Sequence, residues 1–174
     1  PFSLSPAGER EVSRARLSSY VRTMIDDLYS ARILMLAANL PYAGRLAAPG
    51  GTGERVAKLC GSRATVDVTL DDQGRVIAFA QDVKACALGQ AAAGVLGQAV
   101  IGAAAAEIAE ARDALSAMLK SGGEGPIGRF EDLRVLRPVA DYPARHASTL
   151  VAVEATLEAV NQALAERTRL AGAA

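Results

Sequence analysis

The chain has 174 residues, with 19 basic and 19 acidic side chains and an aromatic content of only 4%. This length fits a single domain that buries about two-thirds of its unfolded surface. The balanced charge argues against nucleic acid and against an anionic membrane surface as partners, and so few aromatic rings leave little to stack on bases.

The N-terminal residues 1–19 are expected to form a flexible tail or an extension of the first helix, and residues 20–174 to form the one domain. Two cysteines are too few for a disulfide framework. No positively charged start followed by an apolar stretch marks a secretory signal. We therefore expect a cytoplasmic protein.

The first predicted elements are a long helix and two short extended segments. Apolar residues at three- to four-residue spacing predict a helix from Glu9 to Ala38, which Pro41 ends. The Pro-Gly-Gly-Thr-Gly run at 49–53 is typical of a turn, with one short strand near Leu46 and another at 55–59. Cys60 follows directly.

A β-hairpin is predicted next. Val66, Val68 and Leu70 alternate with polar residues, which is the period of a strand with one solvent-exposed face. The turn at 71–74 ends in glycine, and residues 76–83 form the returning strand.

The segment 85–106 has no charged residue and is long enough to span a bilayer. Ten alanines and four glycines make it too weakly apolar for that, so we expect a buried helix whose small residues allow close packing. A helix at 104–120, a glycine-rich loop at 121–129 and a short element at 130–136 follow. The last helix is predicted to begin with Asp141 as its N-cap and Pro143 in its first turn.

This order of elements predicts an α+β fold, with a small antiparallel sheet of about three strands packed on one side by helices. Cys60, Cys86 and His146 all stand at predicted element ends, where a rigid scaffold can present ligands. The residues alone leave two interpretations open. The cysteines are buried apolar side chains, or they meet the histidine at a metal site.

Several motifs resemble those of the NifU/IscU/SufU iron–sulfur cluster scaffold family over residues 28–160. Cys60-Gly61-Ser62 is similar to the first ligand motif, Cys-Gly-Asp, and Ala85-Cys86-Ala87 with its small-residue helix is similar to the second. The segment from Tyr142 to Ser148 resembles the one that carries the last ligand. The resemblance implies a SufE/NifU-like architecture and metal ligands Cys60, Cys86 and His146, with Ser62 and Arg145 as accessory residues.

Two departures from the family pattern affect the implied ligand set. Ser62 stands in place of the aspartate, and Ala147 is taken to stand where the family has its third cysteine. A [2Fe–2S] cluster is usually held by four cysteine thiolates, whereas zinc accepts three mixed protein ligands and an open fourth position.

The resemblance implies an iron–sulfur cluster scaffold or carrier that is not an enzyme, with a cysteine desulfurase and recipient apo-proteins as partners. A zinc-dependent sulfur acceptor, in which Cys60 takes sulfur from the desulfurase, is one alternative. A degenerate interaction module of the same fold without metal is the other, and Ser62 and Ala147 favour it.

Overall fold

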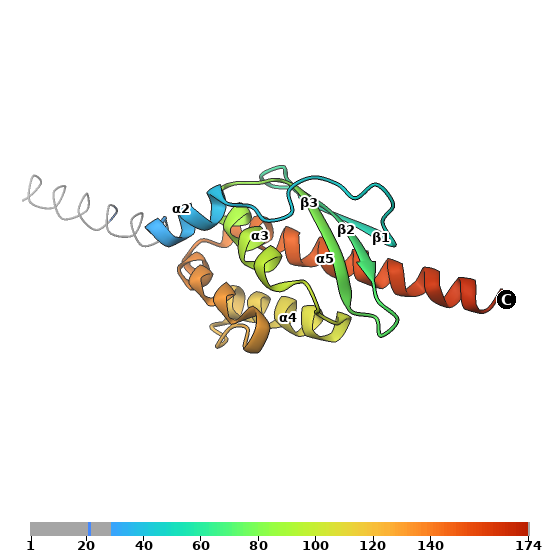
Figure 1. Cartoon of the computed structure of the whole chain (residues 1–174). Helices are drawn as coiled ribbons and strands as arrows, with labels where there is room; N and C mark the ends of the chain where they lie inside the picture. The colour runs from blue at the N-terminus through green and yellow to red at the C-terminus, as the bar shows by residue number, and fades with distance from the viewer. Residues whose placement is uncertain (1–20, 22–28, 174) are drawn as a thin grey trace, which may run out of the picture.

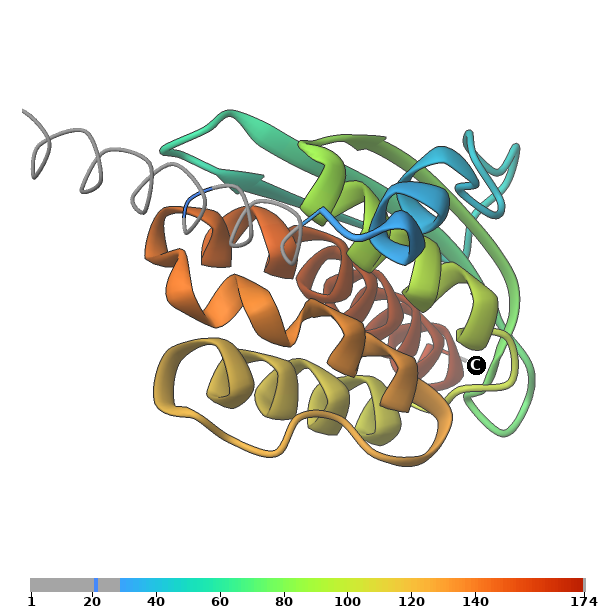
Figure 2. The same cartoon turned by 90° about the vertical axis from the view of Figure 1, so that its left-hand side faces the viewer.

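A three-stranded antiparallel sheet forms one layer of the molecule, and helices pack on one of its faces (Figures 1 and 2). The computed structural model describes Val21 and residues 29–173. Its elements are α2 (Ala31–Ala38), β1 (Gly51–Ala57), β2 (Ser62–Leu70), β3 (Val76–Lys84), α3 (Ala87–Ala99), α4 (Ala105–Ser121), the 3-10 segment η1 (Gly128–Asp141) and α5 (Pro143–Ala171). The predicted α+β class and three-stranded sheet are confirmed.

The hairpin of β2 and β3 is confirmed, with Val66 opposite Gln81 and Val68 opposite Phe79. The solvent-exposed face predicted for β2 is wrong, because Thr65 and Asp67 are buried as well as the valines. Asp67 accepts hydrogen bonds from the Arg45 guanidinium and from the Leu46 amide. Part of the segment before β1 therefore lies over this face of the sheet.

The glycine run predicted as a turn is instead the start of β1. A Cβ on Gly51 would lie 2.2 Å from the Ala159 carbonyl oxygen, and one on Gly53 would lie 2.1 Å from that of Ala155. Two residues of a strand and four residues of a helix rise by nearly the same distance, about 6 Å, so the two glycines face successive turns of α5. Glycine is required here because the helix backbone contacts the strand backbone.

The helix predicted from Glu9 does end at Ala38, but the prediction that it is continuous is wrong. The chain is not helical at 29–30, and α2 begins after Ser30, whose Oγ accepts the Ile33 amide as an N-cap. The predicted helix at 9–28 and the tail at 1–19 lie outside the described residues, except for Val21.

Most of the uncharged segment forms α3, and most residues of this helix are buried, so the predicted buried helix is confirmed. It ends near Val100, and Gly102 at φ 83° turns the chain into α4, which confirms the second helix. None of the helices in the described part of the chain has the length and hydropathy needed to cross a membrane.

Helix α5 runs across the face of the sheet and contacts β1, β2, α3 and α4 (Figure 1). Pro143 occupies its first turn as predicted, but Asp141 is not its cap. Asp141 is the last residue of η1, and Tyr142 stands at the N-cap position without a side-chain capping bond.

Candidate metal and sulfur site

Cys60 and Cys86 line one pocket although they come from different parts of the chain. Cys60 lies in the turn between β1 and β2, and Cys86 is the N-cap residue of α3. The pocket has a volume of about 480 Å³ and opens widely to solvent. It is lined by Cys60, Gly61, Ser62, Val83, Lys84, Ala85, Cys86, Gln90 and Arg145.

The first turns of α5 bring Arg145 to the same pocket and place Ser148 beside Cys86. Ser148 is fully buried, and its Oγ lies 3.5 Å from Cys86 Sγ. The Ser148 hydroxyl donates to the Arg145 carbonyl at 2.9 Å, so its oxygen is left to accept from the Cys86 thiol. Ala147 is exposed and is not among the lining residues. Ser148, rather than Ala147, is therefore the residue of this turn that lies beside Cys86.

The surroundings of Cys60 favour its thiolate. Its Sγ lies 3.2 Å from Ser62 Oγ, and hydrogen bonds from the Ser62 hydroxyl and backbone amide lower the pKa of the thiol. Burial opposes this effect, and the positive charge of Arg145 lowers the pKa of Cys60 a little further. Cys60 is exposed, so its thiolate is open to reaction with an incoming group.

His146 is not brought to the pocket with the two cysteines. It is 8% exposed, and its Nε2 lies 3.1 Å from the Val139 carbonyl oxygen and 3.2 Å from that of Ala140. Carbonyl oxygens can only accept, so Nε2 carries the proton and the ring ties α5 to the end of η1.

No group of three or more histidine, cysteine or carboxylate side chains that could hold a metal occurs within the described part of the chain. Of the three predicted ligands Cys60, Cys86 and His146, the two cysteines line the pocket and His146 does not. Ser148, which the sequence reasoning did not select, is the nearest further oxygen donor. The sequence could have indicated Ser148, because it follows Arg145 by three residues and residues three apart share one face of a helix.

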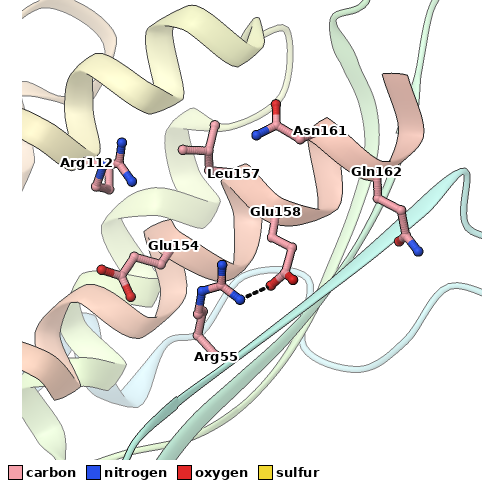
Figure 3. Close-up of a pocket in the computed structure, with 7 residues that line it drawn as sticks. All are labelled: Arg55, Arg112, Glu154, Leu157, Glu158, Asn161 and Gln162. Carbon is pink, nitrogen blue, oxygen red and sulfur yellow. Dashed lines mark hydrogen bonds and ion pairs between the residues drawn. The ribbon is translucent and has the colours of Figure 1, made fainter. Parts of the chain in front are cut away.

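A larger groove of about 690 Å³ lies away from the thiols, between β1, α4 and α5 (Figure 3). Arg55 reaches across it to form an ion pair with Glu158. Glu158 also accepts the Glu54 amide, and Gln162 accepts the Thr52 amide. These side chains of α5 satisfy outward-facing amides of the β1 edge, so the groove has a structural role.

The fold and the site can be compared with known proteins. No family model and no curated protein matches the chain. Its structure is similar to that of a nitrogen-fixing NifU-like protein (N-terminal) from Brucella abortus, with a TM-score of 0.79 and 48% identity, covering 82% of this chain and 99% of that one.

A second similar structure is described as an iron–sulfur cluster assembly scaffold protein for the SUF system, from Fervidobacterium islandicum AW-1. It has a TM-score of 0.70 and 20% identity, and the match covers 78% of this chain and 98% of that one. This second likeness shows the shared fold. Because 48% identity extends over nearly the whole length of the NifU-like structure, the chain belongs to the NifU/IscU/SufU-like family.

Proposed function

We propose that this chain is an iron–sulfur cluster assembly scaffold or carrier that holds iron or a nascent cluster, as its cargo, through Cys60 and Cys86. The observation that carries the proposal is that both thiols line one open pocket, with the Ser148 hydroxyl 3.5 Å from Cys86 Sγ. Family membership and the scaffold description of the second similar structure support it.

The donor set fits a thiophilic cargo. Thiolates favour iron–sulfur clusters and zinc, and the pocket lining has no carboxylate that would favour magnesium or calcium. The Ser148 hydroxyl gives its proton to a backbone carbonyl and is a weak ligand in that state. His146 would have to leave two carbonyls to serve as the third ligand we expected. The chain therefore offers two strong ligands.

The test is metal analysis and visible absorbance of the full chain, purified without oxygen and reconstituted with iron and sulfide. We expect a cluster chromophore in the wild type and its loss in Cys60→Ser and in Cys86→Ser. Thr156→Val is the control, because it removes a buried α5 hydroxyl that donates to the Ala152 carbonyl of the same helix. A cysteine-independent chromophore, or no bound iron at all, would refute the proposal.

A second candidate is a sulfur acceptor for a cysteine desulfurase, with zinc at the thiol pair. The exposed Cys60 and its lowered pKa favour it. The Cys60 thiolate would attack the outer sulfur of the desulfurase persulfide, break that S–S bond and release the desulfurase thiolate, leaving a persulfide on Cys60. Bound zinc, together with one added sulfur atom on Cys60 by mass spectrometry, would favour this candidate over the scaffold.

Either function implies a cysteine desulfurase and recipient apo-proteins as partners, acting in the cytoplasm.

The interaction module without metal is the third interpretation. It predicts that neither iron nor zinc accompanies the purified protein and that Cys60→Ser leaves every metal measurement unchanged.

A further inference from the structure

The basic side chains of the described residues fall into two groups. Most arginines make a hydrogen bond or an ion pair: Arg32, Arg45, Arg55, Arg75, Arg112, Arg129, Arg137, Arg167 and Arg169. Among these same described residues, six cations have no carboxylate or carbonyl partner: Lys58, Arg63, Lys84, Lys120, Arg134 and Arg145. Two of the six line the thiol pocket, and two more neighbour its lining residues in the sheet or in the turn.

These four residues, Lys58, Arg63, Lys84 and Arg145, form what we call the cationic rim. Lys84 and Arg145 line the pocket itself. Arg63 is the cross-strand partner of Lys84, and Lys58 lies in the turn that carries Cys60.

In the protein without a bound anion, the positive charges of the cationic rim repel one another. Like charges directly opposite each other on neighbouring strands repel, as Arg63 and Lys84 do. No carboxylate lines the pocket to offset them. The result is a local positive potential on a chain of zero net charge, which attracts an anion to the two thiols.

The number of cysteine ligands in the pocket indicates which chemical group the anion would bring with it. A [2Fe–2S] cargo is usually bound by four thiolates, and this pocket supplies two. The pocket is open enough to admit the others from solution, since a Cβ on Gly61 would meet no atom within 4 Å and Leu59 is 86% exposed.

We propose that the pocket binds an anionic low-molecular-weight thiol, a small cysteinyl peptide of the glutathione kind, together with the cargo. Its carboxylates bind the cationic rim at Lys84 and Arg145. Its thiolate binds iron at a position that the protein leaves vacant. This inference rests on the proposed scaffold function.

The experiment reconstitutes the full chain with iron and sulfide in the presence of either glutathione or the neutral thiol 2-mercaptoethanol. Native mass spectrometry counts the thiol molecules retained with the cluster. We expect wild type to form its cluster at a lower concentration of glutathione than of 2-mercaptoethanol, with two glutathiones retained per cluster.

Charge removal tests the role of the rim. In Lys84→Gln/Arg145→Gln the half-saturating glutathione concentration should rise about fivefold for each lost charge, as expected for about 1 kcal/mol per solvent-exposed charge pair. The 2-mercaptoethanol requirement should not change. Lys120→Gln/Arg134→Gln removes two unpartnered cations away from the pocket and is the matched control. Urea midpoints establish that each variant is folded.

A third protein thiol provides an independent test. Ser148→Cys places a thiol beside Cys86, so the number of retained glutathiones should fall from two to one. Equal cluster formation with both thiols, or a glutathione requirement unchanged by loss of the rim, overturns this inference while the scaffold proposal stands. Absence of a cluster with either thiol overturns both.

Discussion

The contact between β1 and α5 gives the sharpest stability prediction, because two adjacent glycines should respond in opposite ways. A Cβ on Gly51 would lie 2.2 Å from the Ala159 carbonyl oxygen and 2.6 Å from the Ala163 amide nitrogen. Both are backbone atoms, so Gly51→Ala forces the helix and strand apart by roughly 1 Å to reach ordinary contact. A Cβ on Gly50 lies at an ordinary 3.4 Å from the Val68 carbonyl oxygen.

We expect Gly51→Ala to lower the free energy of unfolding by about 3 kcal/mol, at the upper end of overpacking costs. For a chain of this length the melting temperature would fall by about 6–12 °C. Gly50→Ala should be neutral, or stabilising by up to about 1 kcal/mol, because alanine restricts the unfolded chain. Urea denaturation followed by circular dichroism measures both variants. Equal stabilities for the two would refute the backbone contact between β1 and α5.

Three further predictions concern single side chains. Ser62→Ala should move the midpoint of iodoacetamide alkylation of Cys60 to higher pH, since it removes the first cause of the lowered pKa, and an unchanged midpoint would contradict that cause. Asp67 is buried, which alone would raise its pKa, but hydrogen bonds from Arg45, Thr52 and the Leu46 amide lower it overall. Its stabilisation is therefore complete above the unfolded-state pKa and lost as pH falls through the folded-state value. Asp67→Asn should cost about 2 kcal/mol at pH 7, typical for hydrogen bonds to a charged group, and much less in urea titrations at acid pH. His146→Ala should lower stability by about 1–2 kcal/mol through the lost link to η1 while bound iron is retained, whereas loss of iron in a folded variant would restore His146 as a ligand.

The hairpin and the buried helix α3 could be predicted because their signals are local. Alternating valines define β2, and a long run of small uncharged residues is compatible with close packing. The start of β1 could not be predicted in this way. Glycine at 51 and 53 resembles a turn locally, and the reason for it is a helix that lies about 100 residues later in the sequence.

The site was predicted in part for a similar reason. Placement at element ends singled out Cys60 and Cys86, and both do line one pocket. The same criterion selected His146, although a helical residue points to only one side of its helix. Two positions on, Ser148 points to the thiols, while the His146 ring bonds to η1. Choosing between them required the rotation of α5, which the packing of the whole domain sets.

The positions that differ from the family's ligand motifs carry small side chains that pack without strain in this fold. Ser62 is 4% exposed and Ser148 is fully buried, so both positions are closed around a hydroxyl. Replacing Ser148 with cysteine exchanges one small uncharged group for another. A carboxylate at Ser62 would instead bury a negative charge beside a thiol that already favours its anion, which is costly. The pocket thus carries less negative charge from the protein than a set of cysteines and aspartate would, while the cationic rim stays unneutralised. This combination suits a site in which part of the negative charge around the cargo comes from a bound ligand.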